Sequence, residues 1–131
     1  MLEFFDLTEP GLRSKGRSVA STAELMSLVE GFSARPPFVG ELTDDRGITL
    51  TVGLGGRFAF VQFCATDGDV PYSVAVAPEL RAPASGVEFN CGGTPTPIEA
   101  RFCLSPDIFK AILSYFFETA GKNPVVTWEE I

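Results

Sequence analysis

Two short acidic stretches are the part of this sequence that comes closest to a metal site. They are Asp44-Asp45 and Asp67-Gly68-Asp69. A calcium loop needs oxygen ligands at several fixed offsets and a distal glutamate, and neither stretch supplies them. Because Asp and Gly are also the residues that tight turns prefer, we interpret both stretches as turns between strands. We expect no metal site and no cofactor.

Glycine-rich stretches at residues 53–56 and 92–93 resemble the loops that hold phosphate groups. A phosphate-binding loop follows a strand and opens a helix, so that the helix N-terminus faces the anion. Here a β-like pattern follows each stretch, which indicates a turn between two strands.

The chain contains no histidine among its 131 residues. This removes the histidine-dependent nucleophile pairs, histidine metal ligands and any imidazole acid or base. An enzyme would have to use carboxylates, Lys, Tyr or Cys. Carboxylates are plentiful, but no pair is distinguished by its spacing, and we predict no catalytic residue.

Cysteine usage and the first residues bear on the compartment. The cysteines are three in number and form no C-x-x-C pair, which favours neither a disulfide framework nor a zinc site. We expect Cys64 and Cys103 to be buried, reduced thiols in strands, and the protein to be cytoplasmic. The start of the chain lacks a basic segment followed by an apolar one, so we expect no signal peptide. No apolar run is long enough to span a membrane.

The formal net charge is −7, and most of it lies after residue 40. A surface of this sign repels nucleic acid and anionic membranes, whereas it attracts a basic protein. The length predicts a single domain, residues 1–131.

Two amphipathic helices are predicted. The first covers residues 21–32, where Ser21 and Glu24 have the spacing of a capping box. The second starts after Ser105 with Pro106 in its first turn, and Gly121 is expected to end it as the left-handed residue. We expect residues 8–21 to form a loop up to the first helix.

Alternating apolar and polar residues from Phe38 onward predict strands joined by short turns. In residues 48–54 the apolar side chains fall on one face, and Thr49 and Thr51 fall on the other. Residues 98–104 are predicted as a strand, and residues after Pro124 as an edge strand. The expected fold class is α+β, an antiparallel meander sheet of about six strands with the two helices packed on it.

The stretch from Val87 to Ile131, VEFNCGG…IEARFCLSPDIFKAILSYFFETAGKNPVVTWEEI, resembles the immunity proteins of bacterial polymorphic toxin systems. The similarity is to the family that accompanies nucleic-acid deaminase toxins. It rests on an aromatic strand with a glycine pair, a Phe-rich helix, a Gly-Lys-x-Pro turn and a final Trp followed by an acid. The matching residues, which we expect to be scaffold, include Gly92, Gly93, Phe116, Gly121, Pro124 and Trp128.

The resemblance implies an immunity protein that binds a cognate secreted toxin and blocks its active site without catalysis. A deaminase acting on nucleic acid presents a basic cleft, which an acidic protein suits. We expect loop carboxylates and a few aromatic anchors on one face to make the contacts. The candidates are Asp44, Asp45, Asp67, Asp69, Glu88, Glu99, Glu129 and Glu130.

The sequence leaves two other functional hypotheses open. The same fold could serve as an adaptor or chaperone-like module that binds a partner without inhibiting it. A small carboxylate-based enzyme or ligand-binding domain is the third reading, and it requires a concave site with converging acids. The sequence leaves the toxin, the binding face and the oligomeric state open.

Overall fold

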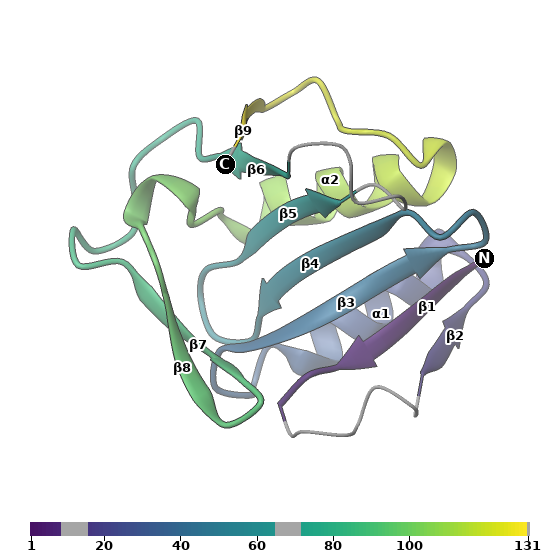
Figure 1. The fold of residues 1–131 in the computed structure, drawn as a ribbon, viewed down its shortest axis with the longest axis horizontal. Helices are drawn as coiled ribbons and strands as arrows, with labels where there is room; N and C mark the ends of the chain where they lie inside the picture. The colour runs from purple at the N-terminus through teal and green to yellow at the C-terminus, as the bar shows by residue number, and fades with distance from the viewer. Residues whose placement is uncertain (9–15, 65–71, 131) are drawn as a thin grey trace.

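The computed structural model describes residues 1–8, 16–64 and 72–130. In this part of the chain, one nine-stranded sheet carries two α-helices on the same face (Figure 1). The strands, in chain order, are β1 (Leu2–Asp6), β2 (Arg17–Val19), β3 (Phe38–Asp44), β4 (Thr49–Leu54), β5 (Phe60–Cys64), β6 (Ser73–Val76), β7 (Val87–Cys91), β8 (Thr94–Ile98) and β9 (Thr127–Glu130). The helical segments are α1 (Thr22–Phe32), the short 3-10 helix η2 (Ala100–Phe102) and α2 (Pro106–Thr119).

The α+β fold with an antiparallel meander is confirmed. Strands β3 to β6 follow one another as antiparallel neighbours, and the order along the main path of the sheet, which leaves out β7 and β8, is β2-β1-β3-β4-β5-β6-β9. The expected count of about six strands was too low. One missed strand, β2, has three residues and lies in the stretch predicted as a loop. Another, β8, reads TPTPI, and its two prolines indicate a turn unless the strand lies at an edge.

The β7–β8 hairpin leaves the meander. It joins β3 through a parallel bridge between Phe38 and Asn90, and β8 pairs with β7 alone. The two-residue turn Gly92-Gly93 has positive φ at both positions, which glycine adopts without strain.

The predicted strand over residues 98–104 was wrong. The strand ends at Ile98, and η2 follows. Its residues Ala100 and Phe102 are buried, and Leu104 is buried in an isolated bridge to Ala59. A 3-10 turn followed by a bridge therefore buries the same alternate residues that a strand would bury.

The capping box of α1 is confirmed with one difference. The Ser21 hydroxyl accepts the Glu24 N–H at 3.1 Å, as predicted. The Glu24 carboxylate accepts the N–H of Ala20, one residue before the cap, at 2.7 Å. The first bond satisfies an N–H of the first helical turn, and the second holds the residue that precedes the cap.

Helix α2 starts at Pro106 after Ser105, as predicted, but Gly121 is not its left-handed end. Ala120 takes that conformation, with φ of 59°, and donates its N–H to the Phe116 carbonyl at 2.8 Å. The Ala120 side chain is buried, so its contact with the core offsets the strain of the backbone. Neither the periodicity nor the composition of the sequence indicates that Ala120, and not Gly121, takes the left-handed conformation.

The main core lies between the sheet and the helices. The strand register puts Phe4, Leu42, Leu50 and Phe63 in one row across β1, β3, β4 and β5. This row belongs to the cluster that contains Leu25 of α1 and the α2 residues Ile112, Leu113 and Phe116. Burial of such side chains contributes about 1.5–3 kcal/mol each.

Trp128, one of the residues expected to be scaffold, packs against this core. Its ring lies edge-on to Phe63, with 6.3 Å between ring centroids, and its indole N–H donates to the Asn123 carbonyl at 2.9 Å. Pro124 lies in the connection between α2 and β9. Trp128 therefore links the last strand to Phe63 of β5 and to the connection that precedes it. No helix in the described ranges combines the length and apolar character needed to cross a membrane.

Candidate partner-binding face

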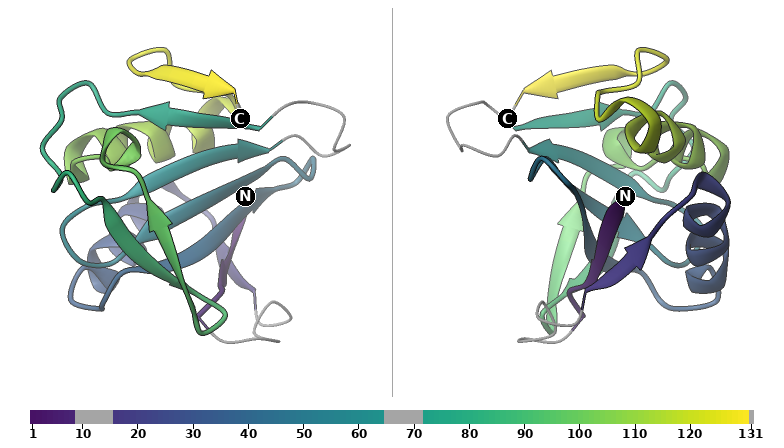
Figure 2. Two further views of the ribbon diagram at one scale, coloured as in Figure 1. Left: turned by 60° about the vertical axis from the view of Figure 1, so that its left-hand side comes forward. Right: turned by 90° about the vertical axis from the view of Figure 1, so that its right-hand side faces the viewer.

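The face of the sheet away from the helices is covered at one end by the β7–β8 hairpin (Figure 2). Phe89 of the hairpin packs on Val39 and Phe60, with 5.0 Å between the Phe60 and Phe89 ring centroids. A Cβ atom at Gly53 would lie 2.2 Å from the Phe60 ring and 2.8 Å from the Phe89 ring. Glycine at this position therefore lets the two rings close over β4.

The rest of this face carries mainly polar side chains, in two rows defined by the strand register. We call it the open face. The first row comprises Phe5, Glu41, Thr51, Gln62, Val74 and Glu129. The second row comprises Ser18, Glu3, Thr43, Thr49 and Cys64.

The two faces of the same strands therefore differ in composition. In β4, Leu50, Val52 and Leu54 point toward the helices and are buried, whereas Thr49 and Thr51 point to the open face and are partly exposed. On the open face Glu3 is exposed, most of the polar strand residues are partly exposed, and Glu41 and Val74 are buried. Since sheet faces that pack on protein are apolar, the polar part of this face is suited to water or to a polar partner. The Thr43 and Thr49 hydroxyls lie 3.2 Å apart and can hydrogen-bond to each other across the strands.

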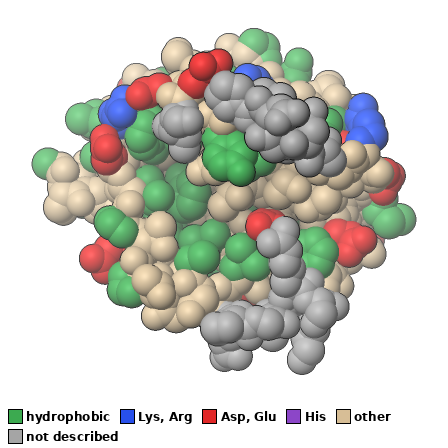
Figure 3. Space-filling view, viewed as in Figure 1, with side chains coloured by type: hydrophobic (Ala, Val, Ile, Leu, Met, Phe, Trp, Pro, Cys, Tyr) green, Lys and Arg blue, Asp and Glu red, His purple; other side chains and the backbone are tan. Residues whose placement is uncertain are grey.

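The described charges on this face are negative. Among the strand residues that point to it, the charged ones are Glu3, Glu41 and Glu129. Figure 3 shows described carboxylate and hydrophobic side chains within this face, and Lys and Arg side chains only near its margin. Tyr72, next to β6, is 44% exposed, and strand alternation places it on the side of Val74.

Two of the predicted carboxylates lie at the β3–β4 turn and not on the open face. Asp44 accepts the N–H groups of Arg46 and Ile48 at 3.0 and 2.9 Å, and its side chain is 7% exposed. It therefore holds the predicted turn together. Asp45 is 80% exposed and lies 3.4 Å from the N-terminal ammonium group.

Two other predicted carboxylates, Glu99 and Glu129, bind the same arginine. Arg101 donates to Glu99 at 3.0 Å and also to Glu129. The hydrogen bonds to Glu129 and then to Glu99 raise the pKa of Arg101 above its ordinary value. Among the predicted carboxylates that the structure describes, Glu129 is the one that the register places on the open face, and Arg101 is its positive neighbour.

The remaining predicted carboxylates are dispersed. Glu88 is exposed on β7 and Glu130 on the terminal strand. Asp67 and Asp69 lie outside the described residues. The structure thus brings together Glu3, Glu41, Thr51 and Gln62, which the sequence interpretation did not select. The alternation of residues 48–54 indicated part of this face, since Thr49 and Thr51 were expected to lie on the same side of the strand.

An ion pair stabilises the end of β1. The Arg35 guanidinium donates to Asp6 at 2.9 Å and to Thr8 at 3.2 Å, and it lies over the Phe38 ring, 3.8 Å from its centroid. Burial raises the pKa of Asp6, but the hydrogen bonds from Thr8 and Arg35 outweigh it and hold this pKa below its ordinary value. Asp6 is therefore a carboxylate used by the fold.

The cysteines differ in burial. Cys103 is buried, as expected, and burial raises the pKa of its thiol. Cys64 is only partly buried, so that expectation was wrong for it: Phe63 points into the core, and its neighbour Cys64 points to the open face. In the described ranges, no three His, Cys, Asp or Glu residues are grouped so that they could hold a metal ion.

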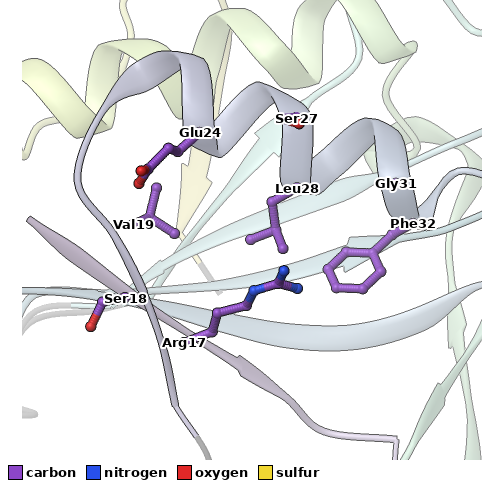
Figure 4. Close-up of a pocket in the computed structure, with 8 residues that line it drawn as sticks. All are labelled: Arg17, Ser18, Val19, Glu24, Ser27, Leu28, Gly31 and Phe32. Carbon is purple, nitrogen blue, oxygen red and sulfur yellow. The ribbon is translucent and has the colours of Figure 1, made fainter.

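A groove of about 470 Å³ lies between β2 and α1 (Figure 4). We call it the β2–α1 groove. Its lining residues are Arg17, Ser18, Val19, Glu24, Ser27, Leu28, Gly31 and Phe32. Arg17 extends from β2 beneath the helix toward Leu28 and Phe32, whereas Glu24 lies beside Val19.

The fold defines an α+β sheet protein with one helix-covered face and one polar face. Residues 13–130 match the family described as Immunity protein Imm1, and the chain belongs to this family. It is thus an immunity protein that neutralises a toxin, and the family implies a protein toxin as its partner. The resemblance to immunity proteins found in the sequence is confirmed. A search of curated proteins found no match to the chain.

Proposed function

We propose that the chain binds its cognate toxin domain through the open face and covers the toxin's active site. Membership of the Imm1 family over residues 13–130 is the observation that carries this proposal. The toxin in question is a nucleic-acid deaminase, and the protein acts in the cytoplasm of the producing cell as one non-catalytic domain.

Charge supports this assignment. An enzyme that acts on DNA or RNA needs a cleft that attracts phosphate, and the net charge of −7 attracts the same cleft. The open face adds carboxylates at Glu3 and Glu129 and an exposed aromatic ring at Tyr72, whereas its third carboxylate, Glu41, is buried. Electrostatic attraction mainly accelerates the encounter, and a buried aromatic anchor slows dissociation.

The predicted carboxylates away from this face are proposed as a second set of contacts. Asp45, Glu88 and Glu130 are exposed and lie around the sheet. They extend the negative field that the toxin meets on approach.

The experiment is an inhibition titration with the purified chain and the toxin domain encoded beside its gene. Deaminase activity is measured on single-stranded DNA, RNA and free nucleosides, to identify the substrate. The proposal predicts complete inhibition at about one chain per toxin. Binding without inhibition would instead indicate the adaptor function, and the absence of binding would contradict the proposed function.

A further inference from the structure

The outer side of β2 is an unused strand edge in the described chain. The sheet order begins at β2, which pairs with β1 only. In an antiparallel pair, backbone groups of alternate residues point away from the partner strand. Residues 17–19 therefore offer N–H and C=O groups to a further strand.

The register of β2 puts a charge where the core would continue. Arg17 pairs with Phe4, and Phe4 pairs with Leu42, which pairs with Leu50. Arg17 thus stands at the end of an apolar row, in the β2–α1 groove, with its guanidinium toward Leu28 and Phe32 (Figure 4). Arg17 is exposed, and its guanidinium can form two parallel hydrogen bonds with a carboxylate partner.

No described carboxylate occupies that position. The salt bridges of the described residues do not include Arg17. Glu24, the acid in the same groove, is engaged by the Ala20 N–H at 2.7 Å. The guanidinium is therefore available to a carboxylate from outside the described chain.

On the helix side of the groove, one lining position carries no side chain. Gly31 lies inside α1, and a Cβ atom there would meet nothing within 4 Å. Glycine in a helix destabilises it relative to alanine, and neither a positive φ nor a close contact requires it here. Its effect in the structure is to leave open space on the helix side of the groove.

We propose that the β2–α1 groove receives an extended segment of the toxin domain, which adds to β2 as a strand and pairs a carboxylate with Arg17. An apolar side chain of the same segment packs on Leu28 and Phe32. Ser18 of β2 pairs with Glu3, so the added strand would adjoin the open face. This inference rests on the proposed function, and it adds an edge contact that the acidic face alone does not give.

Two substitutions test the groove. Arg17→Glu reverses the charge, and Gly31→Leu fills the space on the helix side. The expected result for each is a loss of toxin affinity of about tenfold or more, measured by calorimetry with the purified toxin domain. Gly31→Leu also raises the helix propensity of α1, so its thermal midpoint should not fall, which separates lost binding from lost folding.

Matched controls are available in the chain. Arg57→Glu makes the same charge change at an exposed base, and Ala23→Leu adds the same side chain at an exposed α1 position, both outside the groove lining. Both controls should bind within about twofold of wild type. Equal effects of the groove variants and their controls would overturn the proposal.

Amide exchange provides an independent measurement on the complex. Strand addition predicts slower exchange in residues 17–19 when the toxin is bound. If wild type inhibits the toxin but these amides and both groove variants behave as in the free protein, the groove proposal fails while the proposed function stands. If the groove instead mediates self-association, light scattering would show a dimer that Arg17→Glu dissociates, and the proposal is likewise overturned.

Discussion

Thr51 of β4 and Gln62 of β5 are direct neighbours in the strand register, at the middle of the open face. Both side chains are partly buried, and both lie on the side opposite the core residues of their strands. A polar pair at the centre of a sheet, where packed sheets carry apolar residues, indicates a surface kept for contacts with water or a partner.

Positive charge at this pair should oppose a basic toxin. Thr51→Lys and Gln62→Lys are each expected to weaken toxin affinity by about tenfold or more, because each puts a like charge at the interface. Calorimetric titration with the toxin domain measures the change. Ala111→Lys adds the same charge at an exposed position of α2, on the helix side, and should leave the affinity within about twofold. Lysine variants that bind like this control would show that the toxin contacts another surface.

Two glycine-to-alanine substitutions should change stability in opposite directions. At Gly53 the added Cβ meets the Phe60 and Phe89 rings at 2.2 and 2.8 Å, so the hairpin must shift, at a cost of about 1–3 kcal/mol. At Gly31 the added Cβ meets nothing, and alanine should stabilise the protein by about 0.5–1 kcal/mol. Urea unfolding of both variants measures the two values. The same sign for both would contradict the described packing around β4 or α1.

The Asp6 carboxylate should make stability depend on pH in the acid range. Since its pKa is lower in the folded protein than in the unfolded chain, its contribution is present above pH about 4 and is lost as the pH falls through the lowered value. Asp6→Asn should therefore destabilise the protein at pH 7 by about 1–2 kcal/mol, and the difference from wild type should shrink in acid. Urea unfolding from pH 7 to pH 3 measures this. A difference that stays constant across this range would show that the charge of Asp6 contributes nothing.

Association with the toxin should depend on salt. The open face and the net charge of −7 predict an association rate that falls as ionic strength rises, because screening shortens electrostatic attraction to about 8 Å at physiological salt. Arg101→Ala removes the base between Glu99 and Glu129 and should speed association at low salt. Stopped-flow kinetics compares it with Arg57→Ala, which makes the same charge change without touching Glu129. An association rate that does not change with salt would contradict the claim that electrostatic attraction accelerates binding.

Much of the fold could be predicted because it follows from local patterns. The capped helix after Ser21, the helix after Pro106 and the alternation of Thr49 and Thr51 each depend on neighbouring residues alone. The strands that escaped prediction depend on tertiary context. The three residues of β2 carry no period of their own, and β8 contains prolines that an edge position accommodates.

The candidate site could be predicted only in its chemistry. Acidic character was readable from composition, but the face that carries it depends on which strands pair and in which register. Glu41 and Thr51 are ten residues apart in sequence and become neighbours only through the β3–β4 pairing. By contrast, Asp44 looked like a surface contact and serves the turn, since its acceptors are used by Arg46 and Ile48.

The most direct test of the open face as the docking surface is the reactivity of Cys64. This partly buried thiol lies on the open face, whereas Cys103 is buried and its raised pKa slows its reaction further. Maleimide labelling, followed by mass spectrometry, gives the rate at Cys64 in the free chain and in the saturated toxin complex. Cys91, at the end of β7 and also partly buried, is the internal reference. The account predicts that toxin slows labelling of Cys64 at least about tenfold relative to Cys91. Equal rates at Cys64 with and without saturating toxin would contradict it.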